Sequence, residues 1–337
     1  MATLYIHEQG ASVRRVHQRL KVVKGNEVLH TVRLRDLDRL VLLGNVDLTA
    51  QAMAVLLEEG IDTVILSSTG RLRGHLQPAE SKNVLLRQAQ FQRYADITFR
   101  MRIAKGIVDG KIRNARAMVH RHAHNHPDPL FAETMAALEI SCEKVTQQET
   151  PEQLLGIEGD AARRYFAAFG KMLRGELIFN GRSRRPPRDA VNAVLSFGYT
   201  LVMTELVGVA AAEGMDAHVG LLHDLNYGRP SLALDVLEEF RQPVVDRLVL
   251  ALVNRKVLQP AHFDGNAERG VLLNDEGRAR FLRYYHKTMD EPFNCRDWAD
   301  ATPATFRLLL RRQMHRMRTA IEFEQDYAPY LHYGRTA

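Results

Sequence analysis

Short hydrophobic runs separated by turn residues occupy the first eighty positions of the chain. Four of these runs have the length and the β-branched, apolar composition of strands, at residues 3–7, 20–24, 39–43 and 63–66. Glycine-containing turns separate them. Residues 47–59 are instead rich in helix formers and stop at Gly60, which predicts one helix. The pattern therefore predicts a β-rich domain over residues 1–80.

After residue 80, apolar residues recur at helical spacing in long stretches. Proline-containing segments divide this part into successive helices, at residues 125–129, 186–187, 230, 243 and 260. We therefore predict an α+β protein with a small N-terminal β-rich domain at 1–80, a linker at 81–88 and a larger all-α C-terminal domain at 89–337. We find no segment that approaches the roughly 18 to 20 apolar residues of a membrane-spanning helix, and residues 1–7 do not resemble a signal peptide. These features predict a cytoplasmic protein.

The 46 basic residues exceed the 40 acidic ones, and this excess is concentrated in one loop. Residues 180–188 contain two prolines and four arginines, Arg182, Arg184, Arg185 and Arg188. Arginine is well suited to forked contacts with phosphate, although the same run could be a solvated surface loop. Cys142 and Cys295 are far apart in sequence, which supports neither a disulfide framework nor a thiolate zinc site.

An acidic stripe marks the helix predicted from Ser231, a candidate N-cap, to about Arg241. At about 100° per residue, Asp235, Glu238 and Glu239 fall in one sector, and apolar residues cover the rest of the circumference. Such a stripe can simply face water. The wide apolar arc instead favours a mostly buried helix whose carboxylates open into a cleft, and buried carboxylates need a cation.

Two more residues could complete a ligand set that is rich in oxygen and has one nitrogen. His223 follows the apolar residues 219–222, where a lone histidine can be a ligand or a core residue. Glu158 is predicted near the start of a helix, where the helix dipole favours a carboxylate without any catalytic role. One imidazole and several carboxylates are what Mg²⁺ or Mn²⁺ accepts, and such ions commonly act on phosphate esters.

The helix predicted over residues 189–203 is mostly apolar but has one polar face. Asn192, Ser196 and Tyr199 share this face at positions i, i+4 and i+7. Polar groups on such a helix need partners. They could be satisfied structurally, or they could orient the ligands of a site as a second layer of contacts.

Four blocks in a fixed order closely resemble CRISPR-associated protein one, the integrase of spacer acquisition. The blocks lie at residues 156–159, 179–199, 220–223 and 231–241. The resemblance covers the whole chain, because that family has a small N-terminal β domain, a short linker and a larger helical domain. It implies metal ligation by Glu158, His223 and Glu238, with Asp235 as an additional acidic residue. Some relatives carry Asp where Glu238 stands, which leaves open whether Glu238 or Asp235 makes the direct bond.

The activity implied by the resemblance is a metal-dependent transesterification that uses Mg²⁺ or Mn²⁺. The 3′-hydroxyl of a short DNA fragment attacks a phosphodiester at the edge of a CRISPR repeat, and attack by water instead gives endonuclease activity. The resemblance also implies a homodimer formed through the β domain and a complex with CRISPR-associated protein two. It assigns phosphate contacts on DNA to four arginines, Arg182, Arg184, Arg185 and Arg188.

Two other functions remain open on the sequence alone. The dipeptide His223-Asp224 could belong to a metal phosphohydrolase that acts on small phosphate esters. Alternatively, the protein could be a DNA-binding scaffold without catalysis, in which the acidic residues only form salt bridges with arginines. The scaffold would be indifferent to metal ions, which separates it from both enzymes.

Overall fold

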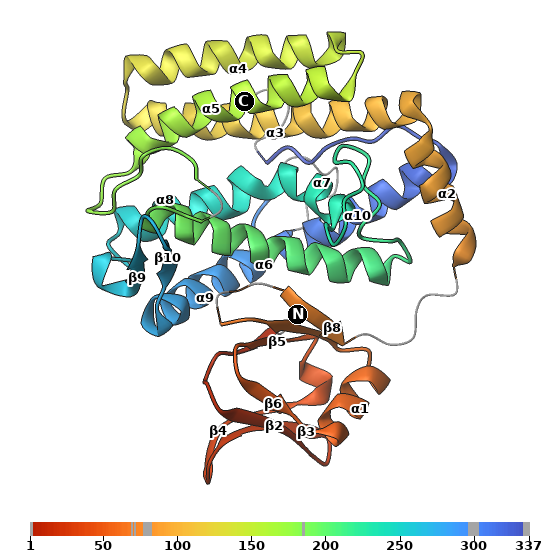
Figure 1. Ribbon diagram of the computed structural model, residues 1–337, viewed down its shortest axis with the longest axis vertical. Coiled ribbons are helices and arrows are strands. Elements are labelled where there is room, and N and C mark those ends of the chain that lie inside the picture. Colours follow the sequence, from red (N-terminus) through yellow and green to blue (C-terminus); the bar gives the residue numbers. More distant parts are fainter. Residues whose placement is uncertain are drawn as a thin grey trace. The chain divides into compact units, whose positions relative to one another are not determined.

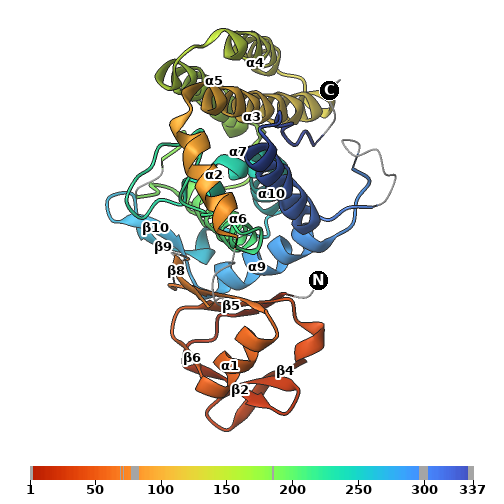
Figure 2. The ribbon, with the colours of Figure 1, turned by 90° about the vertical axis from the view of Figure 1, so that its right-hand side faces the viewer.

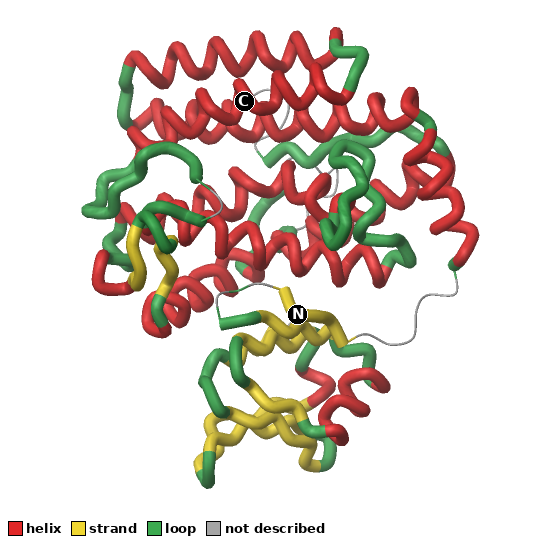
Figure 3. The backbone as a smooth tube through the Cα atoms, in the orientation of Figure 1, coloured by secondary structure: helices red, strands yellow, loops and turns green. Residues whose placement is uncertain are grey.

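The computed structural model describes residues 3–68, 70, 72–76, 83–183, 186–295 and 303–332 (Figure 1). The chain divides into two compact units, Met1–Ser81 and Lys82–Ala337. Strands dominate the first unit and helices the second (Figure 3). This distribution confirms the predicted α+β class.

In its described residues, the N-terminal unit contains two four-stranded sheets, one α-helix and a short 3-10 helix, Leu34–Asp36. Its strands are β1 (Thr3–Ile6), β2 (Ala11–Val16), β3 (Arg19–Lys24), β4 (Glu27–Arg33), β5 (Arg39–Leu43), β6 (Val46–Leu48), β7 (Asp62–Leu66) and β8 (Leu72–Leu76). One sheet has the order β1-β5-β7-β8 and the other has the order β4-β3-β2-β6. β1, β5 and β7 run parallel, and β8 pairs antiparallel with β7.

Apolar side chains from both sheets and from α1 (Ala50–Glu58) form the core of the N-terminal unit. Every residue of β5 is buried, as expected for an apolar strand between two parallel neighbours. The side chain of Thr49 caps α1 by accepting a hydrogen bond from the N–H of Ala52. The helix begins later than the predicted residue 47, because β6 takes up Val46–Leu48.

The second unit is mostly helical. Its helices are α2 (Val84–Ala95), α3 (Ile97–Asn125), α4 (Pro129–Gln147), α5 (Pro151–Met172), α6 (Ala190–Ala212), α7 (Ser231–Phe240), α8 (Arg247–Asn254), α9 (Asp275–Asp290) and α10 (Phe306–Phe323). α3, α4 and α5 pack side by side in one layer, and α6, α7 and α10 lie on the opposite side of α3 from α4 (Figure 2). This arrangement places α3 against both α5 and α7, the helices that carry Glu158 and Glu238.

Two boundaries in this unit differ from the predictions. The predicted linker at 81–88 is wrong for residues 84–88, because α2 begins at Val84 behind the N-cap Asn83. The prediction of an all-α domain is wrong for the antiparallel hairpin of β9 (Phe263–Asn266) and β10 (Gly270–Leu273). The hairpin strands are only four residues long, and β9 is mostly polar, so neither strand shows a clear period in the sequence.

Pro243 does not end a helix, contrary to the prediction. It lies in a π-helical segment, Arg241–Asp246, that joins α7 directly to α8. A wider turn leaves one carbonyl outside the regular hydrogen-bond ladder, so a residue without an N–H fits there. Ser231 is likewise not the N-cap of α7, because it is the first helical residue and its hydroxyl donates to the carbonyl of Asp224.

α6 is the apolar central helix of the second unit. By length and composition it could cross a membrane, which corrects the expectation that no segment approaches this limit. Its most apolar window is 67% buried inside the structure, so α6 packs as a core helix.

Candidate active site

Three helices bring two glutamates and one lysine together in the helical unit. A capping box of Thr150 and Gln153 starts α5 at Pro151. Glu158 therefore lies two turns inside the helix, where the dipole effect expected for a first-turn carboxylate has faded. The helix dipole therefore does not explain why a carboxylate stands at position 158. The partner of Glu158 is Lys111, from the buried face of α3.

Lys111 forms ion pairs with two carboxylates at once. Its Nζ contacts Glu158 Oε1, and it lies 2.6 Å from Glu238 Oε2. The side chain of Lys111 is 7% exposed, that of Glu158 is 19% exposed and that of Glu238 is 5% exposed. Both glutamates therefore point at one positive charge in a place that water barely reaches.

Arg241 provides a second cation for Glu238. Its Nε and Nη2 donate to Glu238 Oε2 and Oε1 at 2.7 and 2.8 Å, in the forked geometry of arginine with carboxylate. Burial raises the pKa of Glu238, but Arg241 and Lys111 outweigh burial and hold this pKa well below its ordinary value. Glu238 is therefore ionised at neutral pH.

His223, from the segment before α7, and Asp235, on α7, form a separate pair. His223 Nδ1 lies 2.7 Å from Asp235 Oδ1, and Asp235 also accepts hydrogen bonds from the backbone N–H groups of Leu221, Leu222 and His223. Asp235 is completely buried, whereas the His223 side chain is 16% exposed. A carboxylate on Nδ1 orients the ring and leaves Nε2 as the nitrogen that faces a ligand.

The acidic stripe on α7 does not open into one cleft as predicted. Asp235, Glu238 and Glu239 are all buried, but each has different partners. Glu239 accepts hydrogen bonds from the Tyr327 hydroxyl at 2.6 Å and from the Tyr330 N–H at 2.7 Å. Glu239 thus supports the C-terminal segment, and only Glu238 lies beside Glu158.

The polar face of α6 holds Arg182. This guanidinium donates to Asn192 Oδ1 at 2.8 Å and to Ser196 Oγ at 3.2 Å. It also lies over the Tyr199 ring, 5.4 Å from the ring centroid, and Arg241 lies 4.5 Å from the same centroid. The polar residues of α6 therefore orient arginines at the site.

Arg188, the other described arginine of the basic loop, is not assembled with Arg182. Arg188 is exposed, and its backbone N–H donates to Ser183 Oγ. Arg184 and Arg185 lie outside the described residues. Of the four arginines predicted to contact phosphate, Arg182 is thus the one placed at the site.

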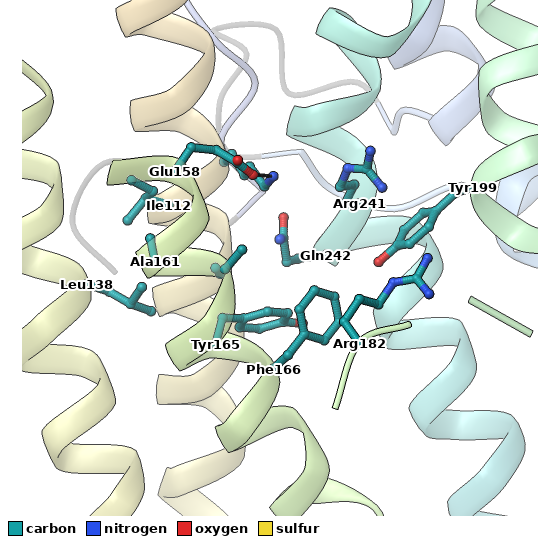
Figure 4. Close-up of a pocket in the computed structure, with 13 residues that line it drawn as sticks. Ile112, Leu138, Glu158, Ala161, Tyr165, Phe166, Arg182, Tyr199, Arg241 and Gln242 are labelled. Carbon is teal, nitrogen blue, oxygen red and sulfur yellow. Dashed lines mark hydrogen bonds and ion pairs between the residues drawn. The ribbon is translucent and has the colours of Figure 1, made fainter. Parts of the chain in front are cut away.

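A pocket lies beside Glu158 and Lys111 (Figure 4). Glu158, Lys111, Arg182 and Arg241 line its polar part, and Phe166 is among its apolar lining residues. A concave site with a few convergent polar groups is typical of a ligand-binding pocket.

Lys111 and Arg241 were missed by the reasoning from sequence. Arg241 stands three residues after Glu238, so the i, i+3 spacing was a usable signal for this pair. Lys111 had a weaker signal, because a single lysine interrupts the apolar face formed by Val108, Ile112 and Ala115. Only the packing of α3 against α5 and α7 reveals its partners.

The residues present suit a divalent ion chemically but are not gathered as a finished metal site. Glu158 and Glu238 converge on one cation, and the Asp235 contact leaves Nε2 of His223 available as a ligand. Nevertheless, within the described ranges no three His, Cys, Asp or Glu side chains form a group that could hold a metal ion. An ion bound here would have to replace Lys111 between the two glutamates.

Asp246 is a buried carboxylate at the end of the π-helical segment. It accepts hydrogen bonds from the hydroxyls of Tyr165, at 2.8 Å, and Tyr199. Burial raises the pKa of Asp246 to about 6, although these hydrogen bonds and Arg241 lower it. Because the folded-state pKa exceeds the ordinary value, protonation of Asp246 favours the folded protein.

The stabilisation from protonated Asp246 is complete below about pH 4 and is lost as the pH rises through about 6. Asparagine does not titrate, so we expect Asp246→Asn to abolish this pH-dependent loss of stability. The free energy of unfolding of the variant relative to wild type should increase by about 3 kcal/mol between about pH 4 and pH 7. Urea titrations followed by far-UV circular dichroism measure this difference. A difference that does not change with pH would contradict the prediction.

Comparison with known proteins places this fold and site. A family model described as CRISPR associated protein Cas1 matches residues 4–287. The chain is 36% identical over 293 residues to the CRISPR-associated endonuclease Cas1 3 of Thermus thermophilus, and the match covers 86% of each chain. These matches extend over both units of the chain.

Two solved structures share the fold. A casposase bound to integration product has a TM-score of 0.85 at 22% identity, over 98% of this chain and 93% of that one. A chain of a Cas6-RT-Cas1–Cas2 complex has a TM-score of 0.81 at 24% identity, over 99% of this chain and 36% of that one. At these identities the likeness concerns the fold.

The matched relatives define a class of CRISPR-associated endonucleases. Within this class, the chain belongs to the Cas1 family, because the family model covers most of its length and a relative is more than one third identical. The resemblance found in the four sequence blocks is thereby confirmed.

Proposed function

We propose that this protein is a metal-dependent DNA endonuclease and integrase that joins the 3′-hydroxyl of a short DNA fragment to a CRISPR repeat. The observation that carries the proposal is the convergence of Glu158 and Glu238 on Lys111, beside a pocket that Glu158, Arg182 and Arg241 line. Two carboxylates that share a cation, beside arginines, suit a phosphodiester and a divalent ion.

In this proposal Glu158, His223 and Glu238 hold a Mg²⁺ or Mn²⁺ ion, and Asp235 acts on it through His223. When bound, the ion polarises the phosphodiester, promotes deprotonation of the attacking hydroxyl and offsets charge on the leaving oxygen. Glu238 is the direct ligand rather than Asp235, because both carboxylate oxygens of Asp235 already form hydrogen bonds, with His223 and with three backbone N–H groups.

The reaction exchanges one phosphodiester bond for another. The 3′-oxygen of the fragment forms a new bond to phosphorus at the edge of the repeat, and the bond to the neighbouring 3′-oxygen breaks. The proton of the attacking hydroxyl passes to solvent, and the leaving oxygen takes one up. Arg182 and Arg241, held by the Tyr199 face of α6, bind the phosphate oxygens and orient the backbone.

DNA, a second copy of the chain and CRISPR-associated protein two are the proposed partners. The names of the related structures, a casposase bound to integration product and a Cas1–Cas2 complex, support DNA and the Cas2 partner. The N-terminal unit supports a homodimer, because Val28 and Leu29 of β4 are exposed at a sheet edge. A cytoplasmic location stays a prediction.

A second candidate function is a DNA-binding scaffold without catalysis. The ion pairs of Glu238 with Arg241 and Lys111 favour it, because the acidic residues already have protein partners. The phosphohydrolase has less support. Asp224, its required second ligand, is 66% exposed and pairs with Arg100 at 2.7 Å.

The experiment that separates these functions incubates the purified protein with a branched DNA that carries a repeat junction, in Mn²⁺, Mg²⁺ or EDTA. We expect joined and cleaved DNA with either metal and none in EDTA. DNA binding without any metal-dependent product would establish the scaffold. Hydrolysis of a small phosphate ester, with no change in DNA, would establish the phosphohydrolase.

A further inference from the structure

Lys111 occupies the position between Glu158 and Glu238 at which the proposed function requires a divalent ion. Its Nζ contacts one oxygen of each glutamate, so the ammonium is the cation on which both carboxylates converge. A buried lysine between the buried Glu238 and the partly buried Glu158 is a strong interaction, because removing one partner leaves a poorly compensated charge largely away from water.

The surrounding structure holds Lys111 in this position. α3 packs closely against the C-terminal segment at the preceding residue, since a Cβ on Gly110 would lie 2.5 Å from Pro329 Cβ. Asn114, one turn further on, donates to the backbone carbonyls of Glu239 and Tyr330 at 2.9 and 2.8 Å. α3 is therefore closely packed on both sides of Lys111, whereas the lysine side chain itself is long and flexible.

The charges around the two glutamates are already balanced by the protein. Glu158 and Glu238 carry two negative charges, and Lys111 and Arg241 carry two positive charges. A divalent ion would add two positive charges that nothing in this group offsets. In a poorly solvated site, such an excess is costly unless an anion enters with the ion.

We propose that Lys111 competes with the divalent ion for Glu158 and Glu238, so that the ion binds tightly only together with a phosphate group of the DNA. The inference rests on the proposed function. The phosphate supplies the missing negative charge. It also binds the displaced ammonium of Lys111, because lysine is a common partner of phosphate groups. By thermodynamic linkage, the ion must then strengthen DNA binding by the same factor by which DNA strengthens ion binding.

The test measures Mn²⁺ binding by titration calorimetry, with and without a branched DNA whose 3′ ends are dideoxy-terminated and cannot react. For wild type we expect the Mn²⁺ dissociation constant to fall at least about tenfold when this DNA is present. For Lys111→Gln without DNA we expect Mn²⁺ to bind at least about tenfold more tightly than to wild type. Lys111→Arg keeps the charge and should bind Mn²⁺ without DNA no more tightly than wild type.

Lys105→Gln is the matched control on the same helix. The Nζ of Lys105 donates to the carbonyl of Thr146 and contacts neither glutamate. Lys105→Gln removes one positive charge, as Lys111→Gln does, but away from the site. We expect this variant to bind Mn²⁺ as wild type does. Equal gains in Lys105→Gln and Lys111→Gln would overturn the inference, because the effect would then follow from net charge alone.

Other outcomes separate the inference from the proposed function. If Lys111→Gln binds Mn²⁺ no more tightly than wild type, Lys111 is not a competitor and the inference is wrong. If Glu158→Gln in the presence of the DNA binds Mn²⁺ as tightly as wild type does, the ion site of the proposed function is wrong. Should Lys111→Gln fail to fold, the wild-type titrations decide, and equal Mn²⁺ affinity with and without DNA would overturn the inference.

Discussion

Replacing Glu158 by glutamine is expected to slow metal-dependent joining and cleavage of DNA at least about a thousandfold. Glutamine keeps the shape of the side chain but removes the negative charge that a divalent ion needs. The substitution also leaves Lys111 paired with Glu238 and no longer with a carboxylate at position 158. The ion pair between Lys111 and Glu238 then becomes stronger. Single-turnover assays on branched DNA in Mn²⁺ measure the rate.

Asp160→Asn provides the control for Glu158→Gln. Asp160 lies two residues further along α5, its side chain is 41% exposed, and it pairs with Arg163 and Arg164 on the surface. The substitution removes the same charge from the same helix without touching the site, so the joining rate should stay within about twofold of wild type. Equal losses in the two variants would show that the effect of Glu158 is not local.

The second large effect is expected for Asp235→Asn. The carboxylate accepts hydrogen bonds from three backbone N–H groups and orients the His223 ring, all at a completely buried position. An amide offers one acceptor oxygen and turns an NH₂ group toward buried donors. We expect the free energy of unfolding to fall by about 2 to 4 kcal/mol and DNA joining to slow at least about a hundredfold.

Asp216 forms an exposed counterpart of the same motif and supplies the control for Asp235. Asp216 Oδ1 accepts a hydrogen bond from the backbone N–H of His218 and lies near Nδ1 of the same histidine. The Asp216 side chain, however, is 37% exposed. Water can replace these contacts, so Asp216→Asn should cost less than about 1 kcal/mol. Urea titration gives both stabilities. If Asp235→Asn lowers the free energy of unfolding no more than Asp216→Asn does, the hydrogen bonds of the buried Asp235 do not stabilise the fold as proposed.

The sequence was most informative where one pattern covers a whole element. The unbroken apolar run of β5 and the helical spacing after residue 80 predict the two kinds of unit, because burial imposes a period on every element. Boundaries were less predictable. Pro243 breaks an isolated helix, yet the packed helix absorbs it in a π-helical turn, which no local rule anticipates.

The residues of the candidate site were predictable in part. Phasing placed Asp235, Glu238 and Glu239 in one sector, and all three are indeed buried on α7. Their separate partners were not predictable, because a sector about 100° wide spans several neighbouring elements in a packed core. The partners come from the 221–223 loop, α3 and the C-terminal segment, which are far apart in the chain.

By itself, the sequence determined the α+β class and the family, and it proposed Glu158, His223, Asp235 and Glu238 as candidate site residues. These follow from local periodicity and from the order of short blocks, and both can be read along one dimension. The tertiary structure alone decided that Lys111 stands between Glu158 and Glu238 and that Asp235 serves His223. Contacts of this kind depend on how helices distant in sequence pack, because the reach of an ammonium or a carboxylate is only a few ångströms.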